Sequence, residues 1–234
     1  MVQIDGAVVL VTGANGGLGG EFVRQALERG ASKVYATART PREWADARVV
    51  PLALDVTNEK SLSDAAAAAS DTTIVINNAG VIGAGGILDG SLDDLRAVFE
   101  TNFFGAVALG RTFAPVLRAN GAAALLDVHS VLSWLGVAGG YSASKAAFWS
   151  ATNSFRVELA GDGIQVVGLH LGYTDTPMIA DIDAPKNDPA DVVRAAYDGL
   201  ESGATEVLAD DLSVSVKALL AEPIETMYPQ LLTK

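Results

Sequence analysis

The fold of this 234-residue chain is decided by one glycine-rich stretch, Thr12-Gly13-Ala14-Asn15-Gly16-Gly17-Leu18-Gly19-Gly20. It lies between a β-branched run at residues 7–11, which predicts a strand, and residues 17–29, which predict a helix. Gly13, Gly17 and Gly19 have the spacing GxxxGxG, and glycine lets a backbone turn sharply and approach a pyrophosphate closely. The start of the helix directs N–H groups at such an anion. A tight turn alone could explain any single glycine, but three at this spacing favour nucleotide binding.

Short apolar runs alternate with helical stretches along nearly the whole chain. Strands are predicted at residues 7–11, 33–38, 49–54, 72–76, 122–128, 164–171 and 206–208. Helices are predicted at residues 17–29, 59–69, 92–119, 141–160, 189–200 and 214–220, the third of them curved or broken near Gly105 and Pro115. Strands that are apolar on both faces and separated by helices indicate an α/β fold with a doubly wound parallel sheet of about seven strands, covered by helices on both faces. We expect residues 1–234 to form a single domain, with residues 221–234 as a loosely packed tail.

The composition excludes several classes of protein. Hydrophobic residues make up 50% of the chain and charged residues 19%, so the chain is not intrinsically disordered. The formal charge of −12 disfavours nucleic acid as a partner, because phosphate backbones are themselves negative. The absence of cysteine excludes disulfides, iron–sulfur clusters and thiol catalysis.

Metal binding and membrane binding are not expected either. Only two histidines are present, His129 and His170, and both are expected to be buried and hydrogen-bonded in the core rather than to bind a metal. No apolar run approaches the ~20 residues of a membrane span, and the N-terminus has no basic segment typical of a secretory signal. We therefore expect a soluble cytoplasmic protein with no membrane partner.

The end of the second predicted strand bears on the choice of nucleotide. An Asp or Glu at this place favours a free ribose 2′-hydroxyl, as in NAD. Residues 35–40 (YATART) contain no carboxylate, but they do contain Arg39. A guanidinium suits a 2′-phosphate by its charge and its planar donors, which favours NADP(H) over NAD(H). The alternative is that Arg39 is an ordinary solvated loop arginine, as we expect for Arg42.

Tyr141 and Lys145 stand four residues apart in a predicted helix, so their side chains share a face. A tyrosine with a pKa near 10 is a poor acid–base catalyst at neutral pH, and an adjacent ammonium group lowers that pKa by favouring the phenolate. The pair is therefore a sensible proton donor for a carbonyl oxygen. The spacing is common, however, and an exposed pair on a surface helix would look the same.

Several motifs occur together in this chain and in a characteristic order. They are residues 12–19 (TGANGGLG), residues 77–80 (NNAG), Asn102, Ser130 and residues 141–145 (YSASK). In combination they resemble the short-chain dehydrogenase/reductase family in its single-domain form, over residues 5–210. The resemblance implies a Rossmann fold, a nicotinamide cofactor and a Ser–Tyr–Lys site assisted by an asparagine.

The resemblance also implies a role for each catalytic residue. Tyr141 is the expected general acid in reduction and the base in oxidation, and Lys145 lowers the pKa of Tyr141 and binds the nicotinamide ribose. Ser130 is expected to hydrogen-bond the substrate oxygen, although it could be a simple strand-end serine and Ser133 is a rival. Asn102 is expected to hold a water in a proton relay to Lys145, or else merely to bend its helix.

Further cofactor contacts follow from the same resemblance. Asp55 and Val56 correspond to an adenine site, although Asp55 could also be a turn residue. The remaining expected contacts are Gly13, Asn15, Gly17, Leu18 and Gly19 in the first loop, Asn77, Ala79 and Gly80 at the ribose, and Gly172, Thr174 and Thr176 at the nicotinamide carboxamide. The family usually has Pro-Gly where this chain has Leu171-Gly172, which puts the rigidity of that loop in doubt.

The predicted function is hydride transfer between NADP(H) and a carbonyl or secondary alcohol. Three segments have no motif of their own and are mostly apolar, which favours an uncharged hydrophobic ketone, aldehyde or alcohol, unless they are packing surface. They are residues 81–88, then Trp134, Leu135, Val137 and Ala138, and then Tyr173 with residues 178–185. The family resemblance implies a homodimer or homotetramer, with Phe148, Trp149 and Phe155 on the outer faces of the long helices. The alternative is a non-catalytic NADP-binding sensor or a scaffold protein that retains the fold.

Overall fold

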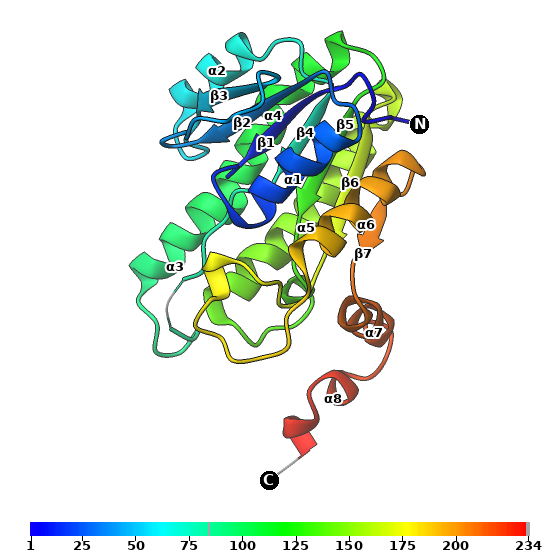
Figure 1. Ribbon diagram of the computed structural model, residues 1–234. Coiled ribbons are helices and arrows are strands. Elements are labelled where there is room, and N and C mark those ends of the chain that lie inside the picture. The colour runs from blue at the N-terminus through cyan, green and yellow to red at the C-terminus, as the bar shows by residue number, and fades with distance from the viewer. Residues whose placement is uncertain (84, 233–234) are drawn as a thin grey trace.

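The computed structural model describes residues 1–83 and 85–232 and contains one parallel sheet (Figure 1). The seven strands lie in the order β3-β2-β1-β4-β5-β6-β7. Their bounds are β1 Val8–Thr12, β2 Lys33–Ala38, β3 Val49–Ala53, β4 Ile74–Asn77, β5 Ala124–Val128, β6 Gln165–His170 and β7 Glu206–Leu208. The strand order reverses between β1 and β4, and open α/β sheets bind their ligands outside the carboxyl ends of the strands at such a switch point. The predicted doubly wound α/β fold is confirmed.

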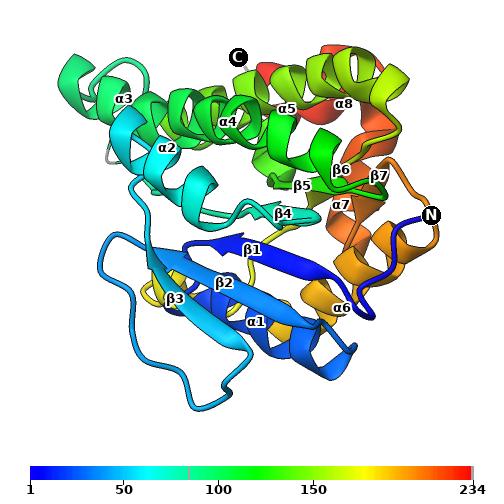
Figure 2. The ribbon, with the colours of Figure 1, turned by 90° about the horizontal axis from the view of Figure 1, so that it is seen from above.

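Helices cover both faces of the sheet (Figure 2). Their bounds are α1 Gly17–Glu28, α2 Glu59–Ala68, α3 Leu92–Phe99, α4 Ala106–Ala119, α5 Gly139–Leu159, α6 Pro189–Glu201, α7 Asp211–Leu219 and α8 Ile224–Met227. Helices α1 and α6 lie on one face, and α2, α4 and α5 lie on the other. No helix within the described ranges is long and apolar enough to cross a membrane.

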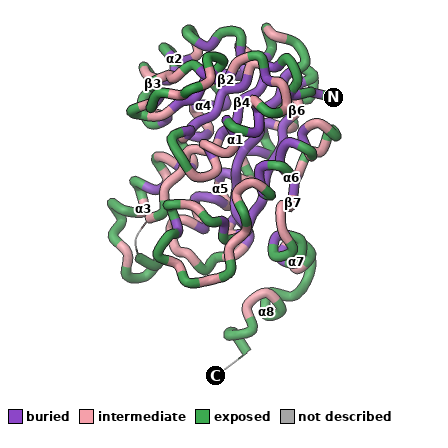
Figure 3. The backbone as a smooth tube through the Cα atoms, in the orientation of Figure 1, coloured by how far each residue is buried: buried purple, intermediate pink, exposed green. Residues whose placement is uncertain are grey.

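Each face of the sheet has its own apolar layer, and the central strands between the layers are buried (Figure 3). On the α1–α6 face the rings of Phe22 and Tyr197 meet edge to face with their centroids 5.4 Å apart. On the other face Leu109 and Phe113 pack with Phe155. Each of these side chains contributes about 1.5–3 kcal/mol by leaving water, so the two layers fix the helices against the sheet.

The predicted helix over residues 92–119 is divided into three parts. Between α3 and α4, the chain forms a wider π-helical turn at Glu100–Gly105. Gly105 allows this turn to approach the segment after β3, because a Cβ there would lie 2.8 Å from Cγ2 of Val56. Pro115 lies inside α4 without breaking it. Its ring is exposed, so water can satisfy the carbonyl that proline leaves without a donor.

Other boundaries also differ from the prediction. Helix α5 begins at Gly139, two residues before Tyr141. Helix α7 begins at Asp211 because Asp210 caps it by accepting a hydrogen bond from the Ser213 N–H. The short helix α8 is an element that the sequence pattern did not predict, and it lies in the C-terminal segment that extends below β7 in Figure 1.

The outer faces of the long helices differ from the expectation as well. Phe148 and Phe155 are buried, and Trp149 packs edge to face against Trp134. Their helix, α5, lies directly on the sheet, so these rings face inward. Exposed apolar side chains of the two long segments include Leu92, Phe104 and Val157, which are 65%, 56% and 79% exposed.

Candidate active site

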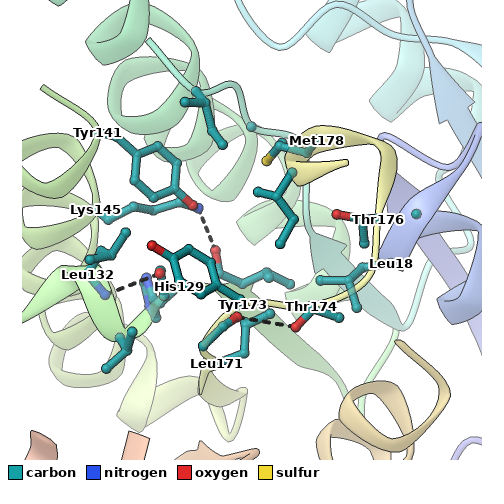
Figure 4. A pocket seen from close by; sticks show the side chains of 18 of the residues that line it. Leu18, His129, Leu132, Tyr141, Lys145, Leu171, Tyr173, Thr174, Thr176 and Met178 are labelled. Carbon is teal, nitrogen blue, oxygen red and sulfur yellow. Dashed lines mark hydrogen bonds between the residues drawn. The ribbon is translucent and has the colours of Figure 1, made fainter. Parts of the chain in front are cut away.

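A single cleft of about 690 Å³ opens at the carboxyl ends of the central strands (Figure 4). It runs from the glycine loop after β1, past Ala79 and Gly80, to Tyr141 and Lys145. In Figure 4, Tyr141 and Lys145 lie on one side of the cleft, while Leu18 and Thr176 lie on the other. The sheet therefore brings residues from five separate segments of the sequence to one place.

The glycine loop is held by close backbone contacts. Gly13 has a φ of +68°, a region that favours glycine. A Cβ at Gly19 would lie 2.1 Å from the carbonyl oxygen of Gly13, so only glycine allows α1 to begin here. Leu18 and Gly17 line the cleft beside this contact. The loop fits a dinucleotide phosphate, since the start of α1 faces the cleft without side chains in between.

Thr12 and Asn78 are two residues that the sequence prediction omitted from the site. The Thr12 hydroxyl accepts hydrogen bonds from the N–H groups of Asn78 (2.9 Å) and Ala79 (3.0 Å), and the Asn78 amide donates to the Thr12 carbonyl (2.8 Å). These bonds join the ends of β1 and β4, and so hold the glycine loop beside the Asn-Asn-Ala-Gly turn. The sequence could have identified both residues, because Thr12 begins the TGANGGLG motif and Asn78 belongs to the NNAG motif.

Tyr141 and Lys145 occupy neighbouring turns of α5. The Lys145 side chain is 4% exposed, and its Nζ donates a hydrogen bond to the Val128 carbonyl at 2.8 Å. The same Nζ lies 5.9 Å from the centroid of the Tyr141 ring. Ser130 follows β5 into the cleft, where its Oγ accepts a hydrogen bond from the Leu132 N–H at 3.1 Å. The three expected catalytic side chains therefore line one cleft.

The pKa values of Tyr141 and Lys145 differ from the expectation. Burial raises the pKa of Tyr141 to about 12, and a hydrogen bond with Ser130 acts in the opposite direction. Burial lowers the pKa of Lys145 to about 8. The predicted net lowering of the Tyr141 pKa by the Lys145 ammonium is therefore not seen. The loss of water around the phenol outweighs any attraction to this ammonium, which donates its hydrogen bond to the Val128 carbonyl.

Asn102 lies in the π-helical turn and is 1% exposed. Its Oδ1 accepts from the Val81 N–H (2.8 Å), and its Nδ2 donates to the Val81 carbonyl (2.9 Å) and to Ser144 Oγ (3.1 Å). A Cβ on Gly80 would lie 3.3 Å from Asn102 Oδ1 and 3.8 Å from Lys145 Nζ. The side chain thus fixes residues 80–81 against α5, and the water relay expected of Asn102 stays a prediction.

The residues expected at the adenine end of the cofactor lie outside the cleft, where β2 and β3 end. Oδ1 of Asp55 accepts from the Thr57 N–H (3.0 Å) and hydroxyl (2.8 Å), and these bonds, together with the Arg39 charge, lower the pKa of Asp55. Arg39 is exposed. Val56 is buried beside Gly105. Oδ1 of Asp55 thus stabilises the turn at Thr57, with Arg39 nearby, and the contact of Asp55 with adenine stays a prediction.

Arg42 is exposed in the loop after β2, and its side chain lies over an aromatic ring. Its guanidinium carbon lies 4.0 Å from the centroid of the Trp44 ring. Asn15 donates to the Thr40 carbonyl (2.8 Å) and accepts from the Arg42 N–H (3.3 Å). Asn15 therefore ties the glycine loop to the segment that carries both arginines.

The loop after β6 forms the wall opposite Tyr141. The Gly172 N–H donates to Asp210 Oδ2 (2.6 Å), and the Thr174 hydroxyl donates to the Gly172 carbonyl (3.2 Å). Thr176 lies over the glycine loop, with its Cβ 3.4 Å from where a Gly17 Cβ would be. Leu171 stands where the family has proline, and Asp210 supplies the constraint that the missing proline does not.

The remaining predicted residues lie behind the cleft. Asn77 donates to the Ala106 carbonyl (3.0 Å) and to Asp127 Oδ1 (3.0 Å), so it braces β4 against β5 and α4. His129 and His170 are buried, as expected, and their rings stack 4.9 Å apart. Ser133, the rival of Ser130, is buried outside the residues that line the cleft. Within the described ranges, no group of three or more acidic or histidine side chains could hold a metal.

Comparison with known proteins places this geometry in a family. The sequence profile described as short chain dehydrogenase matches residues 7–187. A short chain dehydrogenase from Burkholderia cenocepacia, solved in complex with NADP, is 36% identical and superposes with a TM-score of 0.92, covering 99% of this chain and 100% of that chain. The ketoacyl reductase HetN of Nostoc sp. is 29% identical over 90% of this chain and 80% of its own length.

A second solved structure shares the fold at lower identity. It is a short chain dehydrogenase/reductase from Burkholderia phymatum in complex with NAD, 24% identical, with a TM-score of 0.84 and 97% of each chain covered. The match of the family profile to most of the chain agrees with the glycine loop, the Tyr141–Lys145 pair and the strand order. The chain belongs to the short-chain dehydrogenase family of oxidoreductases.

Proposed function

We propose that the protein is an NADP(H)-dependent oxidoreductase that interconverts a carbonyl group and a secondary alcohol of a small apolar molecule. One observation carries the proposal: a single cleft joins the glycine loop to Tyr141, Lys145 and Ser130 and continues into an apolar pocket. The bound nicotinamide supplies the hydride. The protein supplies the proton and the orientation of the reacting carbon.

In this proposal each polar residue of the cleft has a separate task. Tyr141 donates its hydroxyl proton to the carbonyl oxygen during reduction and takes it back during oxidation. Ser130 donates a hydrogen bond to the same oxygen and stabilises the charge that develops there. Lys145 binds the ribose of the cofactor and assists the ionisation of Tyr141. Asn102 holds the Gly80 segment in place beside Lys145.

The preference for NADP(H) is supported by charge at the end of β2. Arg39 and Arg42 lie there, and residues 35–40 contain no carboxylate that would bind a free 2′-hydroxyl. The relative of highest TM-score among those described above was solved with NADP, whereas the Burkholderia phymatum protein was solved with NAD. The two arginines favour NADP(H) for this chain.

The chemistry of the pocket favours an uncharged substrate. Among the described residues that line the cleft, Lys145 is the only lysine or arginine, and aspartate and glutamate are absent. The outer walls are apolar and consist of Ile82, Leu132, Leu135, Val137, Met178, Ile179, Ile182 and Leu212. A charged substrate would lose its hydration there without gaining a partner.

The test is a panel of ketones, aldehydes and alcohols of increasing size, each assayed with NADPH and with NADH. We expect turnover of apolar ketones, a lower KM for NADPH than for NADH, and loss of that difference in the double variant Arg39→Ala/Arg42→Ala. Binding of NADPH without turnover of any compound would favour the sensor alternative. Failure to bind either nucleotide would favour a scaffold protein.

We also propose that the protein acts as a homodimer or homotetramer. The exposed apolar side chains of Phe104 and Val157 would be covered by a second copy of the chain. Sedimentation at micromolar concentration should show a dimer or tetramer, and a monomer would refute this.

A further inference from the structure

Within residues 1–83 and 85–232, one carboxylate and one lysine are buried, and no arginine is. Asp127 of β5 is 0% exposed and Lys145 of α5 is 4% exposed. Lys145 has a task in the proposed reaction, but Asp127 has none so far. A buried charge is costly unless it is paired or hydrogen-bonded, so the presence of a carboxylate at this position requires an explanation.

Neutral groups hold the Asp127 carboxylate in place. Asn77 donates to its Oδ1 at 3.0 Å, and the Thr152 hydroxyl donates to its Oδ2 at 2.7 Å. Behind them, Nε2 of His129 lies 3.1 Å from the Thr152 hydroxyl, whose proton is directed to Asp127. We name Asn77, Asp127, His129 and Thr152 the buried carboxylate cluster. Its hydrogen bonds fix the position of the negative charge without neutralising it.

The cluster lies beside the Lys145 ammonium. Lys145 and Thr152 lie two turns apart on the face of α5 that packs on the sheet. Lys145 Nζ donates to the carbonyl of Val128, the next residue after Asp127 along β5. The ring of Phe148 fills the space between, 5.6 Å from Lys145 Nζ and 4.6 Å from the His129 ring. Carboxylate and ammonium are therefore close but do not form a direct ion pair among the described residues.

Arg156 is the other cation that faces the cluster, one turn further along α5. A Cβ at Gly168 of β6 would lie 2.8 Å from Arg156 Nη2 and 3.4 Å from His129 Nε2, so this glycine gives both groups their space. The guanidinium donates to the carbonyls of Val166 and Thr205 at the surface end of the strands. Arg156 therefore has other acceptors and lies on the far side from the cleft.

The remaining groups that face Asp127 are uncharged at neutral pH. Burial lowers the pKa of His129 well below its usual value, and it lowers the pKa of His170, which stacks on His129. Burial also raises the pKa of Asp127 to about 6, although the bonds from Thr152 and Asn77 oppose this. The carboxylate is thus ionised above about pH 6, and its attraction opposes the lowering of the Lys145 pKa by burial.

We propose that Asp127 is a positioning residue that acts through Lys145: its fixed carboxylate keeps Lys145 in the ammonium form at the pH where Tyr141 exchanges its proton. The inference rests on the proposed function, because it gives Asp127 a part in that reaction. A cation next to Tyr141 favours the phenolate, and a neutral amine does not. Loss of the Asp127 carboxylate therefore removes the positive charge that favours the Tyr141 phenolate, while Tyr141 itself is unchanged.

The direct test measures the charge of Lys145 without any turnover. The wild-type protein and Asp127→Asn are labelled across a pH series with a small amine-reactive anhydride, and modification of Lys145 is quantified by peptide mass spectrometry. We expect an apparent Lys145 pKa near 8 in the wild type and a value lower by roughly one unit or more in Asp127→Asn. An unchanged value in a folded Asp127→Asn protein would overturn the inference.

Two further variants control this test. Glu206→Gln removes a carboxylate that bonds Lys217 and lies near His170, and it should leave the Lys145 pKa unchanged. If Asp127→Asn does not fold, Asp127→Ser removes the same charge and leaves room for water. A Lys145 pKa that falls equally in Glu206→Gln would show a general effect of net charge and would also overturn the inference.

Activity provides the second readout. In alcohol oxidation with NADP+, the acidic limb of the kcat profile should move to higher pH in Asp127→Asn, with NADP+ affinity unchanged. The reason is that Tyr141 must then ionise without a cation beside it. A uniform loss of kcat at every pH would indicate a structural role and contradict the inference. If the wild type turned over no compound, the proposed function would fail, while the labelling result would still decide the effect of Asp127 on Lys145.

Discussion

At the scale of single residues, the Tyr141 hydroxyl depends on Ser130. Burial raises the pKa of Tyr141, and the hydrogen bond with Ser130 opposes that rise. Ser130→Ala should therefore reduce kcat for ketone reduction by roughly 10²-fold, since one donor to the developing oxyanion is lost. Steady-state kinetics with NADPH measures this.

Ser133→Ala is the matched control for that variant. Ser133 is three residues away, equally buried and without a hydrogen-bond partner for its Oγ among the described residues. It should retain near wild-type kcat. Equal losses in the two variants would remove Ser130 from the catalytic group.

The sequence identified the residues of the site better than it identified their contacts. Ser130, Tyr141 and Lys145 could be predicted, since each belongs to a motif with a fixed spacing. The bonds of Asn102 to Val81 could not, because the two residues are 21 positions apart and meet only through the fold. The raised pKa of Tyr141 was also missed, because burial is a property of the folded cleft and not of the Tyr–Lys spacing.

At the scale of elements, α1 can start where it does because Gly19 has no side chain. A Cβ there would lie 2.1 Å from the Gly13 carbonyl oxygen, and the backbone would have to move. Gly19→Ala should therefore weaken NADPH affinity by at least roughly tenfold and lower the unfolding temperature. Fluorescence titration and thermal unfolding measure the two effects.

Gly161→Ala is the control for the substitution itself. Nothing lies within 4 Å of a Cβ at Gly161, which is far along the chain from the glycine loop. This variant should match the wild type in both measurements. Normal NADPH binding by Gly19→Ala would show that the close approach of α1 is dispensable.

The strands and most helices were predictable, because the side chains that pack into the core produce an apolar periodicity that can be read in the sequence. Residues 7–11 and 34–38 are β-branched or apolar on both faces, as central parallel strands require. The π-helical turn at Glu100–Gly105 was not predictable, because its sequence suits a helix and only contact with Val56 and Val81 sets the wider turn. Helix α8 was missed because four residues carry no periodicity.

At the scale of the whole molecule, the C-terminal segment reaches back to the substrate pocket. The Tyr228 hydroxyl accepts a hydrogen bond from the Gly136 N–H at 2.8 Å, 92 residues away in sequence. Leu135 and Val137, on either side of Gly136, line the cleft. The end of the chain therefore holds one wall of the pocket in place.

Tyr228→Phe should affect substrate binding more than chemistry. Loss of one hydrogen bond costs about 0.5–1.5 kcal/mol, which corresponds to a roughly 2- to 10-fold higher KM for a bulky ketone with little change in kcat. The affinity for NADPH should not change. Leu231→Ala, an exposed substitution in the same segment, should leave all three constants unaltered, and a lower kcat without a change in KM for Tyr228→Phe would contradict this role.

The most direct measurement is NADPH-dependent ketone reduction by Tyr141→Phe, with NADPH binding followed in parallel by fluorescence. The variant removes a single oxygen atom from the cleft and leaves the ring that packs there. We predict unchanged NADPH affinity and a fall in kcat of roughly 10²- to 10⁴-fold. Binding and turnover both equal to the wild type would contradict the assignment of Tyr141 as the proton donor.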